Sequence, residues 1–175
     1  MGLNFFALSI IWYDKKNYCR NNFATIFLFQ RYLDLTKTAV TDTLAQVLAS
    51  FPFLESLLLT YTNVTSMFIP ALDQLPLLAS LKLTGCRNID DQGILLLSES
   101  RVLSMSLRNL ALGHRGISDQ ALARISQLQQ LEALRLWNTS VSPAAAEAIA
   151  TQTGLRRQEQ MATGPGTYLF SRSGL

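Results

Sequence analysis

The stretch that decides the fold is Leu78-Ala-Ser-Leu81-Lys-Leu83, because its L-x-x-L-x-L pattern recurs along the chain. Full copies also begin at Leu54, Leu107 and Leu131, a partial one begins at Gln30, and a decayed one begins at Leu155. The start positions 30, 54, 78, 107, 131 and 155 are separated by 24, 24, 29, 24 and 24 residues. Steps this regular predict an architecture built from stacked copies of one structural unit.

Each unit is expected to contain a strand followed by a helix. Leucines two residues apart share one face of a strand, which predicts that this face is buried. Small or acidic pairs that favour a helix start come next. These pairs are Thr41-Asp42, Asp90-Asp91, Ser118-Asp119 and Ser142-Pro143. Pro52 and Pro76 are placed where the preceding helices should end, and the 29-residue unit carries an insertion around Ser98–Met105.

The pattern resembles the leucine-rich-repeat family, most closely the long intracellular type of ribonuclease-inhibitor-like and F-box-associated repeats. The resemblance implies an α/β solenoid over about residues 30–155, with a parallel sheet on the concave face and helices on the convex face. Arg115 departs from the family pattern, in which that side chain points inward. We therefore expect an apolar segment at 1–29, a five-unit solenoid at 30–154, and a decayed repeat with a flexible tail at 155–175.

The charge pattern argues against nucleic-acid binding. The net charge is +3, but residues 30–154 hold 9 basic and 10 acidic residues, so the excess lies in the two ends. A nucleic-acid footprint would more often be a basic stripe on the folded face.

The N-terminus and the cysteines bear on the compartment. Residues 3–13 are apolar but too short to span a bilayer, which leaves a targeting segment, a cap on the repeats or a misassigned start as alternatives. Membrane insertion is not expected. Two cysteines, Cys19 and Cys86, favour a reduced cytoplasmic or nuclear setting, whereas the sequons at Asn63 and Asn138 keep a secreted protein as the alternative.

No residue pattern indicates catalysis. His114 is the only histidine and falls in an expected loop. Asp90-Asp91 fits a helix cap better than a metal site, and Cys86 fits a small inward-facing filler. No glycine-rich phosphate loop is found. We therefore expect a protein that is not an enzyme and has no metal or cofactor.

The best candidate site is the exposed face of the expected strands. Trp, Tyr and Arg are enriched at interface hot spots, although Trp137 could instead pack on the C-terminal residues. The candidate partner-binding residues are Asp34, Leu58, Tyr61, Lys82, His114, Arg135 and Trp137. The predicted function is binding of a protein partner, possibly as an adaptor. A secreted or membrane-associated recognition protein and a structural fragment of a longer repeat protein are the alternatives, and the oligomeric state is left open.

Overall fold

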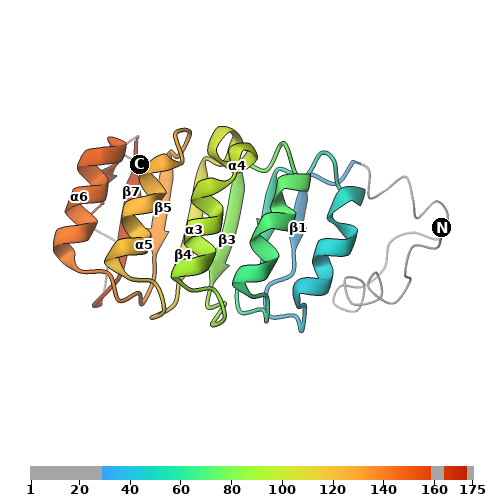
Figure 1. The fold of residues 1–175 in the computed structure, drawn as a ribbon, viewed down its shortest axis with the longest axis horizontal. Helices are drawn as coiled ribbons and strands as arrows, with labels where there is room; N and C mark the ends of the chain where they lie inside the picture. Colours follow the sequence, from blue (N-terminus) through green and yellow to red (C-terminus); the bar gives the residue numbers. More distant parts are fainter. Residues whose placement is uncertain (1–28, 159–163, 173–175) are drawn as a thin grey trace.

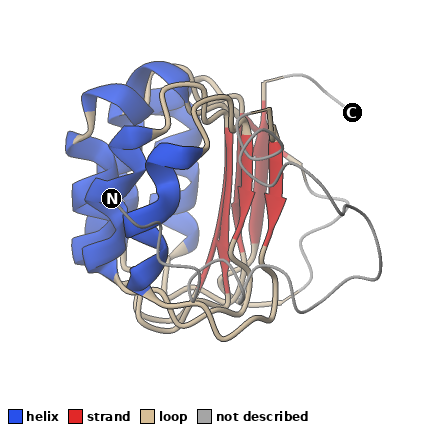
Figure 2. Cartoon of the chain, turned by 90° about the vertical axis from the view of Figure 1, so that its right-hand side faces the viewer, coloured by secondary structure: helices blue, strands red, loops and turns tan. Residues whose placement is uncertain are grey.

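The computed structural model describes residues 29–158 and 164–172, and these form two layers. One layer is a sheet, and the described helices cover a single face of it (Figure 1, Figure 2). The chain is therefore an α/β protein, as the sequence predicts. The three interpretations of the apolar N-terminal segment fall on residues 1–28 and lie outside the described residues.

Strands and helices alternate along the chain. The strands are β1 (Tyr32–Asp34), β2 (Ser56–Leu58), β3 (Ser80–Thr84), β4 (Asn109–Gly113), β5 (Ala133–Leu136), β6 (Arg156–Arg157) and β7 (Tyr168–Ser171). The α-helices are α3 (Asp91–Glu99), α4 (Arg101–Ser106), α5 (Asp119–Arg124) and α6 (Pro143–Thr153). The 3-10 helices are η1 (Asp42–Ser50), η2 (Ser66–Gln74) and η3 (Ile125–Gln127).

The sheet register reproduces the spacing of the leucines. Its order is β1-β2-β3-β4-β5-β7-β6, and the first five strands run parallel. Leu33 lies opposite Leu57, which lies opposite Leu81, so 24 residues of sequence correspond to one step across the sheet. Between β3 and β4 the step is 29 residues, because Leu81 lies opposite Leu110. The predicted parallel sheet is confirmed.

The core lies between the sheet and the helices. Leu57, Leu59, Leu81 and Leu83 point toward the helices and are almost completely buried. One strand–helix unit has too little surface to bury its own leucines, so each unit depends on its neighbours. The core is consequently continuous from β1 to α6.

The helix starts are tied together by a chain of hydrogen bonds that we call the N-cap ladder. The first helical residue of one unit bonds to the N-cap residue of the next unit. The pairs are Asp42 with Thr65, Ser66 with Asp90, Asp91 with Ser118, and Asp119 with Ser142. The ladder ends at Pro143, whose side chain has no hydrogen-bonding group. It thus joins five consecutive units.

The additional residues of the third unit form the short helix α4 (Figure 1). The Ser100 hydroxyl accepts a hydrogen bond from the Leu103 backbone N–H at 3.0 Å, which caps this helix. Leu103 is fully buried. The inserted turn therefore packs on the core and leaves the register of β4 intact.

The end of the chain differs from the flexible tail that the sequence suggested. Residues 168–171 form β7, which runs antiparallel between β5 and β6. Tyr168 and Phe170 are buried in the core. The turn before β7 is fixed because the Gly166 carbonyl accepts hydrogen bonds from the Thr139 backbone N–H at 3.0 Å and from its hydroxyl at 2.9 Å. A returning strand with alternating buried aromatic residues therefore closes this end of the sheet.

The turn after β4 differs from the turns of the other units. Lys37, Tyr61, Gly85 and Asn138 have positive φ angles at the equivalent position, whereas His114 does not. Arg115 is exposed instead of pointing inward, and its Nε lies 3.4 Å from the Asn138 amide oxygen. The departure of Arg115 from the repeat pattern thus coincides with a change of backbone conformation.

Candidate functional site

The face of the sheet opposite the helices, which we call the strand face, carries most of the predicted binding residues. Along β3, half-buried and buried side chains alternate, so the half-buried Lys82 lies on this face while Leu81 and Leu83 face the helices. Lys82 is in register with Ala111 of β4, which is in register with Arg135 of β5. Lys82 and Arg135 are therefore two strands apart, which corresponds to about 10 Å between their backbones.

Tyr61 lies over a glycine of the neighbouring unit. Its φ is 57°, a left-handed conformation that a tyrosine seldom adopts. A Cβ atom added to Gly85 would lie 2.4 Å from Cδ1 of the Tyr61 ring, so the ring rests directly on the Gly85 backbone. The ring nevertheless keeps much of its surface in solvent, because Tyr61 is 59% exposed. Glycine at position 85 is therefore required for this ring position.

The carbonyl oxygen and Cβ atom of Trp137 lie close to Gly113 on the other side of this surface. A Cβ atom added to Gly113 would lie 2.9 Å from the Trp137 carbonyl oxygen and 3.1 Å from its Cβ atom. Trp137 is 41% exposed. The Gly85 N–H donates a hydrogen bond to the Gly113 carbonyl at 2.7 Å, which joins the two glycines. We call Tyr61, Gly85, Gly113, His114 and Trp137 the aromatic–glycine surface.

His114 lies within this surface, beside Gly113 and opposite Gly85 in the extension of the β3–β4 register. It is half-buried, and its Nδ1 accepts a hydrogen bond from the Gly116 backbone N–H at 3.0 Å. That bond fixes the imidazole with respect to the turn. His114 is therefore held in the turn that follows Gly113.

Five of the seven predicted binding residues lie together, and two do not. Tyr61, His114 and Trp137 belong to the aromatic–glycine surface, and Lys82 and Arg135 lie beside it on the strand face. Asp34 lies at the far end, on β1, two strands from Lys82. Leu58 was predicted to be an exposed contact residue, which is wrong, because it is only 9% exposed. It is in register between Asp34 and Lys82, whose side chains flank it on the same face.

Gly85 and the buried Gly113 are the residues of this surface that are absent from the predicted set. A signal was present, since Gly113 directly follows the last leucine of an L-x-L pair and Gly85 lies two residues after one. The repeat pattern alone did not show that Tyr61 and Trp137 from the units on either side would lie close to them.

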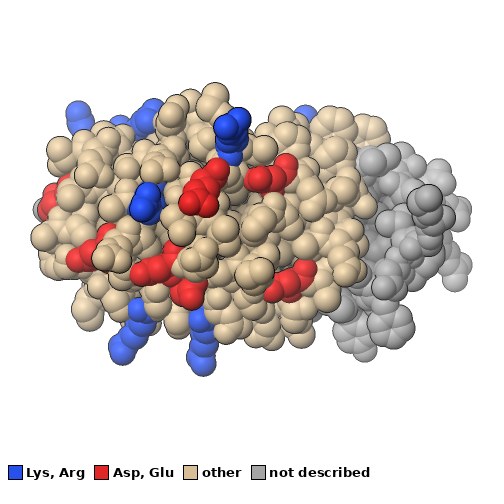
Figure 3. Space-filling model, viewed as in Figure 1, with Lys and Arg blue, Asp and Glu red and all other residues tan. Residues whose placement is uncertain are grey.

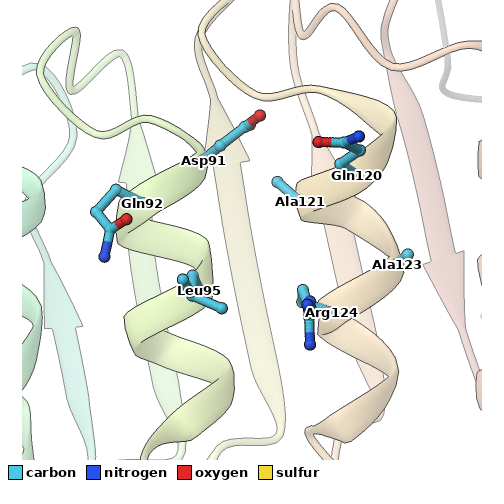
Figure 4. A pocket seen from close by; sticks show the side chains of 7 residues that line it. All are labelled: Asp91, Gln92, Leu95, Gln120, Ala121, Ala123 and Arg124. Atoms are coloured by element: carbon cyan, nitrogen blue, oxygen red, sulfur yellow. The ribbon is translucent and has the colours of Figure 1, made fainter.

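The helix side has an open hollow of about 510 Å³ between α3 and α5 (Figure 4). Asp91, Gln92 and Leu95 line it from α3. Gln120, Ala121, Ala123 and Arg124 line it from α5. The Asp91 carboxylate already accepts hydrogen bonds from the Ser118 backbone N–H at 2.8 Å and its hydroxyl at 2.5 Å. Its oxygens therefore serve the N-cap ladder, and no convergent set of free polar groups marks this hollow as a reactive site.

The side chains that could take part in chemistry, Cys86 and Asp90, have structural partners. Burial raises the pKa of the Cys86 thiol, which donates to the Leu59 carbonyl at 2.9 Å. The pKa of the Asp90 carboxyl is lowered, first because the Ser66 hydroxyl donates to it at 2.7 Å. Within residues 29–158 and 164–172, no three His, Cys, Asp or Glu side chains are grouped as metal ligands. No helix in these ranges is long and apolar enough to cross a bilayer.

Comparison with known proteins adds no assignment: no protein-family model matches the chain, and a search of curated proteins gives no match.

Proposed function

We propose that this chain is a leucine-rich-repeat protein that binds a protein partner on its strand face. The family assignment rests on the L-x-x-L-x-L pattern, the 24-residue register of the parallel strands and the single helix layer. The observation that carries the binding role is the aromatic–glycine surface. Two large aromatic side chains remain exposed there, and the ring of one of them, Tyr61, rests on Gly85.

Binding a partner carries a cost, because the side chains at the interface must be ordered. Immobilising a side chain at an interface costs roughly 0.5–1.5 kcal/mol. The Tyr61 ring already lies against Gly85, so part of this cost is met for Tyr61 before a partner arrives. Aromatic residues in that state are typical of interface hot spots. The surface is thus suited to bind a partner with little rearrangement.

The proposed role is recognition without catalysis, in an adaptor-like protein of the cytoplasm or nucleus. The buried Cys86 thiol is consistent with a reducing compartment. Secreted recognition is the second candidate, because Asn63 and Asn138 of the two sequons are both exposed. Cell fractionation with a glycosidase treatment separates the two: a mobility shift after treatment would favour secretion.

The test is affinity purification with mass spectrometry on the full chain. The Tyr61→Ala, Trp137→Ala variant is compared with the wild type and with a Met67→Ala, Met105→Ala control. Met67 and Met105 are exposed apolar residues of η2 and α4, on the helix side. Partners lost with the aromatic pair and kept by the control support the proposal, once thermal unfolding shows that both variants are folded. Equal partner sets for all three proteins would contradict it.

A further inference from the structure

Charged residues are sorted between the two layers of the described chain. Most acidic residues there lie on helices or their N-caps: Asp42, Asp73, Asp90, Asp91, Glu99, Asp119 and Glu147. Only two basic residues, Arg101 and Arg124, lie on helices. Figure 3 shows this helix side, with acidic groups spread over the helices and several basic groups at its upper and lower edges. The helix layer is therefore acidic, and the basic residues are concentrated on the strands and loops.

The acidic residues of the strand side leave part of this positive charge uncompensated. Arg31 pairs with Glu55 at 3.0 Å, and Arg108 pairs with Glu132 at 2.6 Å. Lys82, Arg135 and Arg156 form no ion pair with any described residue. Asp34, the remaining acidic residue, lies at the β1 end of the sheet, where it accepts a hydrogen bond from the Thr36 backbone N–H at 2.9 Å.

Lys82 and Arg135 adjoin the aromatic–glycine surface. Arg135 and Trp137 are two residues apart on β5 and its extension, so they lie on the same face. Lys82 and Gly85 are similarly close on β3 and the turn that follows it. Between Lys82 and Arg135 lies Ala111, whose small side chain leaves the two long ones free to converge on a ligand from either side. Hot-spot aromatics and unpaired positive charge thus occupy one continuous area.

We propose that the partner segment bound at this surface is acidic, with carboxylates that contact Lys82 and Arg135 and an apolar side chain that packs between Tyr61 and Trp137. This inference rests on the proposed function and specifies its ligand. Complementary charge steers association and rejects basic competitors. Nucleic acid is a poorer match, because its binding depends on contacts with many phosphates, and Lys82 and Arg135 are the only basic residues on β3, β4 and β5.

The test uses a randomised twelve-residue peptide library selected against the immobilised full chain. The proposal predicts that recovered sequences are enriched in Asp and Glu and contain at least one large apolar residue. The best peptide is then synthesised and its affinity measured by fluorescence anisotropy. A Lys82→Glu, Arg135→Glu variant should bind it roughly tenfold or more weakly, because it replaces attraction by repulsion. A Lys82→Gln, Arg135→Gln variant should show a smaller loss.

The matched control reverses two charges on the other layer. An Arg101→Glu, Arg124→Glu variant has the same net charge as the Lys82→Glu, Arg135→Glu variant. Its affinity should stay within about twofold of the wild type, because exposed charges on the far layer are largely screened at physiological salt. Equal losses in both variants would mean that only net charge matters, and would overturn the proposed site.

The outcomes separate this inference from the function on which it rests. Neutral or basic peptides that need Trp137 but tolerate both Lys82 and Arg135 replacements would overturn the acidic ligand and leave partner binding intact. Failure to select any peptide that needs Tyr61 or Trp137 would overturn both. A fluorescent twenty-nucleotide single-stranded RNA that binds more tightly than the best peptide, with dependence on Lys82 and Arg135, would also overturn the acidic segment.

Discussion

Asp119 accepts two hydrogen bonds from Ser142, one from the backbone N–H and one from the hydroxyl, both at 2.7 Å. Asp119 begins α5, and Ser142 is the N-cap of α6, so this pair joins the fourth unit to the fifth. The Ser142 hydroxyl oxygen also accepts a hydrogen bond from the Ala145 backbone N–H at 3.2 Å. One serine therefore caps its own helix and anchors it to the previous one.

Replacing Ser142 with Ala should destabilise the protein by about 1–2 kcal/mol, the usual range for loss of a helix cap. The free energy of unfolding is measured by urea titration. The control is Ser126→Ala, because the Ser126 hydroxyl bonds only to the Ala123 carbonyl of its own helical segment. A control loss as large as that of Ser142→Ala would show that the link between units contributes nothing.

The Asp119–Ser142 pair also predicts that the stability of the folded chain depends on pH. The backbone N–H and hydroxyl of Ser142 lower the pKa of the Asp119 carboxyl in the folded chain. A carboxyl whose folded pKa is depressed adds stability above its unfolded pKa, near pH 4, and that stability is lost as the pH falls through the folded pKa. Asp90 acts in the same direction through Ser66.

The melting temperature should therefore fall as the pH decreases from about 5 to 2.5. In an Asp119→Asn variant this fall should be smaller, because the titrating group is absent. Melting curves of both proteins across this range provide the measurement. Identical slopes for the wild type and the variant would show that Asp119 does not contribute to the acid sensitivity.

The third prediction concerns the turn into β7. Gly166 has a φ of 67°, and an added Cβ atom would lie 1.9 Å from the Thr139 carbonyl oxygen. Gly154 has a similar φ of 69° but no atom within 4 Å of such a Cβ. Both Ala variants incur the backbone strain, of about 1 kcal/mol, and only Gly166→Ala adds the clash.

Gly166→Ala should consequently lower the melting temperature more than Gly154→Ala does. It should also loosen β7, which is detectable as faster amide hydrogen exchange at residues 168–171. If the two variants behave alike, the contact between Gly166 and Thr139 is not a constraint on the turn.

Core packing gives a fourth prediction. Leu81 is fully buried at the centre of β3, in register with Leu57 and Leu110 on either side. Leu81→Ala should cost about 2–5 kcal/mol, through lost burial and the cavity left behind. Leu77→Ala serves as the control, because Leu77 is 46% exposed and should cost much less. Urea unfolding of both variants measures the difference.

The parallel part of the fold could be predicted, because the residues that define each strand lie close together in the sequence and recur in every unit. Leu57, Leu81 and Leu110 are at fixed spacings, and each spacing became one step across the sheet. The N-cap residues Ser118 and Ser142 were equally visible from their positions before each helix. Which residues bond across units was not, because the N-cap ladder joins side chains 23 to 27 residues apart.

β7 and the aromatic–glycine surface could not be predicted in the same way. Tyr168–Ser171 lacks the leucine pattern, and its antiparallel pairing with β5 depends on a reversal of the chain that the repeats do not encode. The burial of Leu58 depends on its neighbours in register on β1 and β3. The positions of Tyr61 and Trp137 depend on glycines in other units. Residue type alone therefore identified the two aromatic residues but not the glycines next to them.

The last prediction tests whether the position of Trp137 depends on Gly113. Gly113→Ala would place a Cβ atom 2.8 Å from Thr84 Cγ2 and 2.9 Å from the Trp137 carbonyl oxygen, so the Trp137 segment must move. In a Trp12→Phe background, Trp137 is the sole tryptophan, and its emission should shift in the Gly113→Ala variant. Partner capture should fall in parallel, although Trp137 itself is unchanged.

The control is Gly154→Ala in the same background, which should alter neither the emission nor capture. Unchanged emission and capture in Gly113→Ala would show that neither the position of Trp137 nor partner binding depends on a glycine at position 113.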